Sequence, residues 1–156
     1  MTMGLLWALC DAISAAITAA HSAWTVEVVA DPQKELGDLK AGDDIEIMIG
    51  PISSEEENVE GSRRGIAGSM TVAMRLRSRV QDLSNTAAAR AKCVAWDQAV
   101  EILQRREGFL AGAFGQVYWT GGTGAIDIGA LRSDKVVSIC STDISFSSLH
   151  LKPKAT

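Results

Sequence analysis

Apolar residues recur at helical intervals in two segments of the chain. Near the N-terminus they follow one another at steps of three and four residues, which predicts a helix with one buried face. The residues of this face are Leu6, Leu9, Ile13, Ile17 and Ala20. A second helix is expected after Ser84 or Asn85, because either side chain can cap its first turn. Its expected buried stripe is Ala88, Ala91, Ala95, Ala99 and Ile102, flanked by Val94 and Leu103.

Alternating apolar and polar residues predict strands in much of the remaining chain. The expected strands cover residues 24–28, 44–49, 70–80, 116–120, 125–131 and 135–151. Gly50-Pro51 is expected to end the second of them. The resulting order of elements predicts an α+β domain that spans residues 1–156. Its sheet should be mainly antiparallel or mixed, with the two helices packed on one face.

Residues 53–65 show no apolar periodicity. They read Ser-Ser-Glu-Glu-Glu-Asn-Val-Glu-Gly-Ser-Arg-Arg-Gly and lie between two predicted strands. We expect an extended, mobile hairpin loop here.

The strand predicted at 70–80 has the cleanest alternation in the sequence. Met70, Val72, Met74, Leu76 and Val80 are expected to face the core. The opposite, solvent-exposed face would then carry a row of arginines at Arg75, Arg77 and Arg79, preceded along the chain by Arg63 and Arg64.

Composition agrees with one globular domain. The chain has 156 residues, of which 47% are hydrophobic and 22% charged, so it can bury a core without disulfides or metal. A net charge of −4 argues against bulk nucleic-acid binding. The cysteines, Cys10, Cys93 and Cys140, have neither metal-site nor disulfide-framework spacing. The Ala-rich N-terminus has no preceding Lys or Arg and is interrupted by Asp11, so we expect no signal peptide and no membrane span.

Candidate catalytic chemistry is sparse. His21 and His150 have no nucleophile or carboxylate at a spacing that indicates a triad, and no metal or cofactor site is predicted. Gly121-Gly122-Thr123-Gly124 is followed by strand-like sequence where a phosphate loop needs a helix, so a tight β-turn is expected. The alternative of a different class is a small enzyme with a site near Tyr118–Gly124 and His150.

Two groups of residues suggest contacts with other molecules. The acidic run Glu55, Glu56 and Glu57 and the arginines named above could meet across a boundary between head-to-tail subunits. The arginine row could also be a solvated face, or it could contact DNA phosphates in a channel. Tyr118 and Trp119 are further candidates for an exposed contact.

The order of these elements resembles the tail terminator and tail-completion proteins of long-tailed bacteriophages. The resemblance comprises the Ala-rich helix running into a strand at 9–29, Pro32 followed by Leu36 to Leu39, and Ile-x-Ile-x-Ile-Gly-Pro at 45–51. It continues with the alternating strand at 70–80, the helix that follows it, and the closing segment 144–151.

The resemblance implies a structural virion protein, assembled in the host cytoplasm, that acts through surfaces and carries out no catalysis. Such a protein forms a ring, expected to be a hexamer, that caps the tail tube, stops its polymerisation and joins the tail to the head connector. Its partners would be its own copies, the tail-tube protein and the head connector or stopper protein, with DNA only as passing cargo. Another head–tail joining protein or a tail-tube subunit is the alternative within the same class.

Overall fold

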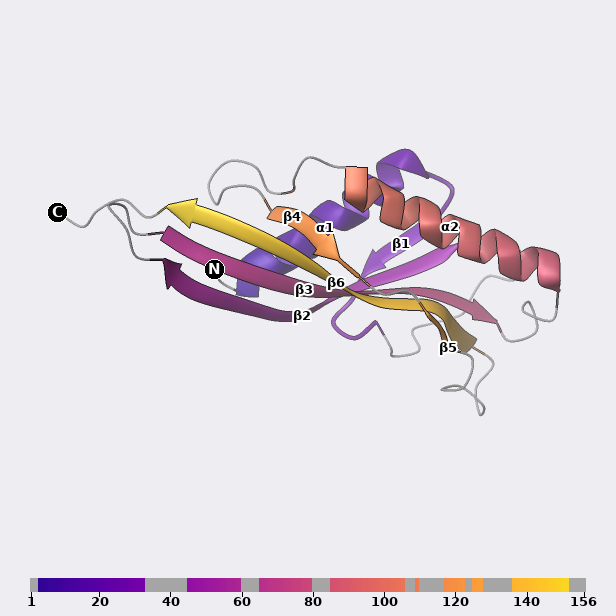
Figure 1. Ribbon diagram of the computed structural model, residues 1–156. Helices are drawn as coiled ribbons and strands as arrows, with labels where there is room; N and C mark the ends of the chain where they lie inside the picture. Colours follow the sequence, from indigo (N-terminus) through magenta and orange to yellow (C-terminus); the bar gives the residue numbers. More distant parts are fainter. Residues whose placement is uncertain are drawn as a thin grey trace.

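The computed structural model describes residues 3–32, 45–59, 65–79, 85–105, 109, 117–122, 125–127 and 136–151. Its elements in chain order are α1 (Met3–Ala20), β1 (Thr25–Val28), β2 (Glu46–Val59), β3 (Gly65–Arg79), α2 (Thr86–Arg105), β4 (Val117–Gly121), β5 (Ala125–Asp127) and β6 (Val136–Leu151). The strands form one sheet, and both helices lie against the same face of it (Figure 1). The α+β class expected from the sequence is confirmed.

The sheet is mixed, with the strand order β1-β2-β3-β6-β4 and β5 also paired with β6. β1 is parallel to β2, and all the other pairs are antiparallel. The three long strands β2, β3 and β6 form its centre, and the short strands lie at its margins. The antiparallel pair β2–β3 is central to the sheet. β1 is added at its β2 side, and β6, with β4 and β5, is added at its β3 side.

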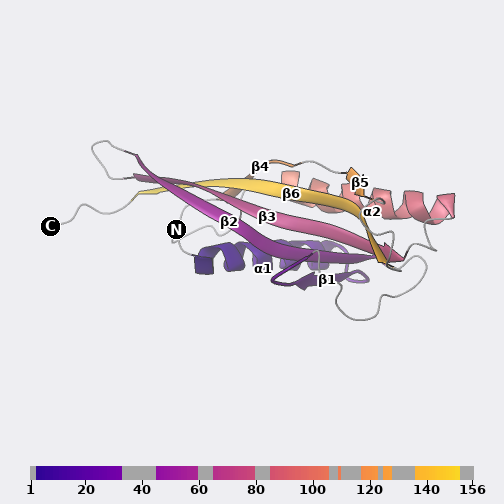
Figure 2. The same cartoon turned by 90° about the horizontal axis from the view of Figure 1, so that it is seen from below.

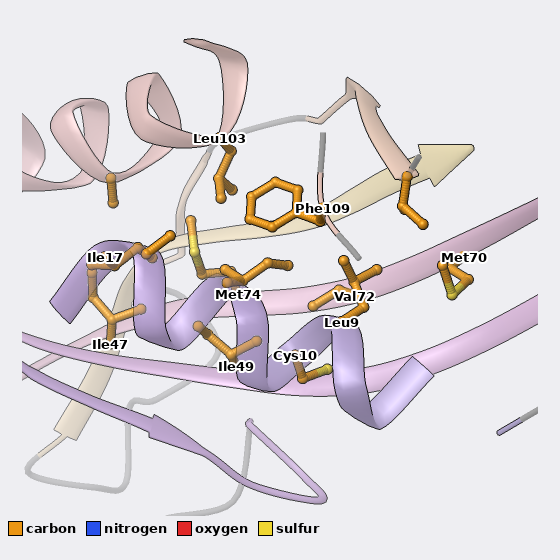
Figure 3. Packing of buried hydrophobic residues seen from close by; sticks show 14 of the residues in the cluster. Leu9, Cys10, Ile17, Ile47, Ile49, Met70, Val72, Met74, Leu103 and Phe109 are labelled. Carbon is orange, nitrogen blue, oxygen red and sulfur yellow. The ribbon is translucent and has the colours of Figure 1, made fainter. Parts of the chain in front are cut away.

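Helix α1 packs over β1, β2 and β3 and supplies much of the core. Leu6, Leu9, Ile13 and Ile17 are fully buried, which confirms the predicted face, whereas Ala20 is exposed. Figure 3 shows Leu9 and Ile17 within one cluster with Met74 and Val72 of β3. The cluster is completed from the side of α2 by Leu103, together with Phe109 (Figure 3).

Helix α2 is capped as the sequence predicts, but its buried stripe is different. Asn85 Oδ1 accepts hydrogen bonds from the backbone N–H groups of Ala87 at 3.0 Å and Ala88 at 3.4 Å. The buried residues are Lys92, Ala95, Trp96, Ala99 and Leu103. The prediction is confirmed at Ala95, Ala99 and Leu103 and is wrong at Ala91 and Val94, which are exposed.

The larger side chains of α2 explain why its buried face includes Lys92 and Trp96 and leaves Ala91 exposed. Trp96 and the aliphatic stem of Lys92 offer more apolar area to the core than an alanine does. The Lys92 ammonium reaches across to β3, where its Nζ donates a hydrogen bond of 2.8 Å to Ser78 Oγ. This hydrogen bond allows Lys92, which is only 1% exposed, to lie on the buried face of the helix. A pattern of apolar residues alone would place a lysine on the exposed face.

The apolar positions of β3 lie where the alternation predicts. Met70, Val72, Met74 and Leu76 are each fully buried on the helix side of the sheet. Val80 lies outside the described residues.

β2 does not end at Gly50-Pro51 as expected. It runs through both residues with a register shift between Pro51 and Ser53. β1 pairs with β2 only as far as Ile49, so Pro51 lies in a stretch with β3 on one side, where a residue without an N–H group is tolerated.

Gly50 allows β2 to pass close to the end of β1. A Cβ atom at this position would lie 2.5 Å from Pro32 Cγ and 2.6 Å from the carbonyl oxygen of Val29. We expect Gly50→Ala to lower the free energy of unfolding by about 1–3 kcal/mol, because a backbone oxygen cannot move aside without shifting the β1–β2 pairing. Urea unfolding measures this, with Gly4→Ala on the exposed face of α1 as the control. Equal stability of the two variants would contradict the predicted clash.

The glycine-rich stretch after β4 lies only partly within the described residues, since Thr123 and Gly124 are outside them. β4 and β5 both run antiparallel to β6, with Gly121 level with Ser145 and Ala125 with Ser141, so the expected tight turn does not join them as a hairpin. Gly121 adopts a φ of 153°, which favours glycine.

Cys10 lies in the core of the protein, and its burial raises the pKa of its thiol to about 12. Between pH 9 and 12 the folded state thus binds more protons at this site than the unfolded state does. Stability should fall as pH rises through this range. We expect a shallower fall for Cys10→Ala than for the parent chain when unfolding free energies are compared between pH 8.5 and 11. Equal slopes of unfolding free energy against pH for the two chains would contradict this prediction.

Neither helix in the described part of the chain has the length and hydropathy needed to cross a membrane.

Candidate subunit interface

Three strands continue beyond the helices as a long, narrow arm. We define the arm as Ser53–Val59 of β2, Gly65–Thr71 of β3 and Ser145–Leu151 of β6, which pair with one another residue by residue. Figure 2 shows these strands running past the N-terminal end of α1 and away from α2. Backbone pairing joins the three strands along the whole arm, from Ser53 with Thr71 and Ser145 to Val59 with Gly65 and Leu151.

The arm corrects the expectation of a loop at 53–65. Residues 53–59 and Gly65 are strand, and only 60–64 of that range lie outside the described residues. The sequence Ser-Ser-Glu-Glu-Glu lacks apolar alternation because neither helix covers this part of the sheet. Apolar periodicity reports burial of an apolar face, so a strand of polar residues such as this one escapes it.

One side of β2 in the arm has no strand beside it in the described structure. β1 ends its pairing at Val28 and Ile49, and the Val29 N–H donates a last hydrogen bond of 2.8 Å to the carbonyl oxygen of Ile49. From Pro51 to Val59, β2 pairs only with β3 within the described residues. We call this stretch of backbone the β2 edge. It presents peptide groups to which another strand can add.

The β2 edge carries an exposed isoleucine next to an acidic run. Ile52, at the register shift, is 46% exposed, and Glu55 is exposed as well. Glu56 and Glu57 lie on the strand opposite Gly68 and Ala67, although their side chains are outside the described set. Open strand edges are the places where another chain can pair, and Ile52 lies at the start of this one.

The arginine row is not exposed where the structure describes it. Arg75 is 7% and Arg77 5% exposed, so the prediction of a solvent-facing row is wrong at both positions. Arg75 Nη1 donates a hydrogen bond of 3.2 Å to the carbonyl oxygen of Met74. Arg77 Nη2 lies 3.8 Å from Glu46 Oε2, which is an ion-pair distance between two buried groups.

The strand register places Arg77 in one row with polar residues of three other strands. Arg77 is level with Glu46 of β2 and with Ser138 of β6, and Ser138 is level with Asp127 of β5. This row places acidic residues on strands at both sides of Arg77. Alternation in a single strand cannot show such a row, because the carboxylates come from residues 31 positions before and 50 positions after the arginine in the chain.

The remaining predicted interface residues can be placed only in part. The side chain of Arg79 is not described, and Arg63 and Arg64 lie outside the described residues. The proposed meeting of these arginines with the acidic run therefore stays a prediction. Glu55 is the member of the acidic run whose exposure is confirmed.

Tyr118 and Trp119 of β4 behave differently from one another. Tyr118 is 46% exposed, as expected for a contact residue. Trp119 is half-buried and packs against the core, so its prediction as an exposed residue is wrong. Its Nε1 is buried and has no hydrogen-bond partner among the described residues. The outer side of Val117 is paired with Phe109 through two backbone hydrogen bonds of 2.8 and 3.0 Å.

The histidines lie on different elements, and His150 lies two residues along β6 from Ser148, the partner of Val117 in β4. His21 follows α1 and stacks on Trp24, with ring centroids 3.7 Å apart and planes 4° from parallel. His150 is level with Ile66 in the arm, three residues along β6 from Ser147, the partner of Tyr118. That separation is roughly 10 Å along a strand. Among the described residues, no three His, Cys, Asp or Glu side chains gather as a metal site requires.

Comparisons with known proteins add little to this description. No protein-family model matches the sequence, and no curated protein matches it. A solved structure whose description names no activity aligns with 99% of this chain and 99% of its own length, at 16% identity and a TM-score of 0.41. A similarity at this level supports no inference about function.

Proposed function

We propose that the chain is a structural subunit of a long-tailed phage virion, of the tail terminator kind. It would assemble into a ring that caps the tail tube and provides the surface for joining the head. Its action requires recognition between surfaces and breaks no covalent bond.

The observation that carries this proposal is the β2 edge on the projecting arm. A strand edge of nine residues with an exposed isoleucine is a liability for a chain that remains a monomer, because it invites pairing with other chains. Assembly removes that liability when a neighbour covers the edge. The order of elements, which resembles that of tail terminators, favours a ring as the form of assembly.

A tail-tube subunit of the same virion is the nearest competing function. Both proteins would associate through strand edges, but a tube subunit stacks ring upon ring whereas a terminator stops at one. Electron microscopy of tube protein polymerised with and without the purified chain separates them. We expect tubes of limited length with the chain bound at one end. Long tubes formed by the chain alone would assign it to the tube, and tubes of unchanged length without bound chain would refute both.

A further inference from the structure

We propose that strand β4 of one copy adds to the β2 edge of the next copy, so that Trp119 of the first lies opposite Ser54 of the second. The proposal rests on the proposed function for its choice of a second copy as the partner. It goes further by naming the segment that covers the β2 edge and the register in which the two strands pair.

The two ends of one row of residues lie on the two open edges of the sheet. Ser54 of β2 is level with Met70 of β3, and Trp119 of β4 is level with Phe146 of β6. Met70 and Phe146 are level with each other, so the row crosses all four strands. Each neighbouring pair is antiparallel, which leaves β4 running opposite to β2. A rotation about an axis along the strands therefore brings β4 of one copy antiparallel to β2 of the next.

The backbone of Trp119 points toward the open side of β4. Val117 exchanges two backbone hydrogen bonds with Phe109, so its peptide groups point away from β6. Peptide groups alternate in direction along an antiparallel strand. Those of Trp119, two residues further along β4, therefore also point away from β6.

The backbone of Ser54 points toward the open side of β2. The carbonyl oxygen of Ile49 accepts a hydrogen bond from Val29, so the peptide groups of Ile49 point away from β3. Met74, which is level with Ile49, then directs its peptide groups to β6, and the alternation along β3 gives Met70 the same direction. Ser54 is level with Met70, so its peptide groups point outward as those of Ile49 do. The two ends of the row can thus form a hydrogen-bonded pair.

Ser54 and Trp119 also each hold a polar atom that needs a partner. Ser54 Oγ and Trp119 Nε1 are buried and make no hydrogen bond to any described residue. Trp119 packs against the cluster that contains Met70, so the side chains of this row lie on the helix side of the sheet. An indole N–H only donates, whereas a hydroxyl can accept. In the proposed register the two side chains lie on one face with Cβ atoms about 5 Å apart, and each atom can satisfy the other.

The same register brings together two exposed residues on the other face of the sheet. Tyr118 is 46% exposed, Glu55 is exposed as well, and each lies one residue from the pair described above. Between copies their Cα atoms would lie about 4.5 Å apart, as in a pair without backbone hydrogen bonds. Within one copy, three strand spacings separate them, which is roughly 14 Å. A disulfide at these positions can therefore form only between copies, because it requires Cα atoms within about 7 Å.

Cysteines at these two positions test the proposal. The variant Glu55→Cys with Tyr118→Cys is compared with Glu55→Cys and Thr120→Cys, since Thr120 is exposed and lies two residues, roughly 7 Å, further along β4. Each single substitution is the control for links through the native cysteines. Linked chains are measured by non-reducing electrophoresis after mild oxidation. Light scattering of the reduced chains gives the mass of the assembly, and thermal unfolding verifies that each variant is folded.

We expect the Tyr118 variant to form chains linked up to the size of the ring, about tenfold or more abundant than in the Thr120 control, because only the first pair meets disulfide geometry. Equal linking in these two variants of an assembled chain would overturn the register and leave the ring standing. Links in the single variant Glu55→Cys would overturn it too, since two β2 edges would then meet. Linked open chains without a ring would support the edge pairing and refute the ring. A parent chain that stays monomeric, with no links in any variant, would refute both.

Discussion

Replacement of Arg77 by methionine is expected to lower the free energy of unfolding by about 3–5 kcal/mol. Arg77 and its partner Glu46 are each 5% exposed, and their charged groups lie 3.8 Å apart. Methionine fills similar volume, so the substitution creates little cavity. It leaves the Glu46 carboxylate buried without its positive neighbour, and this uncompensated charge accounts for the large effect.

Urea unfolding of Arg77→Met and Arg105→Met provides the comparison. Arg105 also pairs with a glutamate, Glu101, at 2.5 Å, but its side chain is 79% exposed. An exposed pair of this kind contributes about 0.3–0.5 kcal/mol. The double variant Glu46→Leu with Arg77→Met should recover a substantial part of the loss, because it removes the stranded carboxylate. Similar effects of the two arginine substitutions would show that Arg77 is not paired in the interior.

Replacement of Ile52 by arginine is expected to prevent assembly while the chain stays folded. Ile52 lies at the register shift where the β2 edge begins and is 46% exposed, so the monomer gains no strain from a longer side chain. In an assembled edge, arginine would place a charged group where the isoleucine is covered by a neighbouring chain, and burying that charge without a partner is unfavourable. An effect of about 2 kcal/mol, typical of a central interface residue, weakens association about 30-fold.

Val94→Arg is the matched control for Ile52→Arg. Val94 is 54% exposed but lies on α2, away from the arm. Both variants add one positive charge and remove one branched apolar side chain. Sedimentation at several concentrations should show the Ile52 variant as a monomer and the Val94 variant at the mass of the parent. If both dissociate, or if only the Val94 variant does, the contact surface lies on α2 instead of the β2 edge.

Helical periodicity predicts the fold well where one face of an element is buried. Leu6, Leu9, Ile13 and Ile17 of α1 form the expected face because each packs on the sheet. In α2 the same reasoning identifies the helix, its cap at Asn85 and the buried Ala95 and Ala99, but it misses the buried Lys92 and Trp96. Alanine side chains are too small to determine alone which side of the helix packs on the core. A charged lysine is normally expected at the surface, but Lys92 is buried and donates a hydrogen bond to Ser78.

The candidate interface could be predicted only in part, for two physical reasons. The stretch 53–57 is polar throughout, so its pairing with β3 leaves no periodic apolar signal in the sequence. Arg75 and Arg77 alternate with buried residues, which normally indicates exposure, but both are buried, and Arg77 lies at ion-pair distance from Glu46. Glu46 comes from a distant strand, and a local pattern carries no information about it.

The molar mass of the purified chain in solution, measured by light scattering across a range of concentrations, tests the central claim most directly. We predict a closed ring with a single mass about six times the 16.6 kDa of one chain, the number that the resemblance to tail terminators implies. Ring formation should depend on Ile52 and be insensitive to Val94. A chain that remains at 16.6 kDa at every concentration, and forms no ring on tail tubes, would contradict the proposed function.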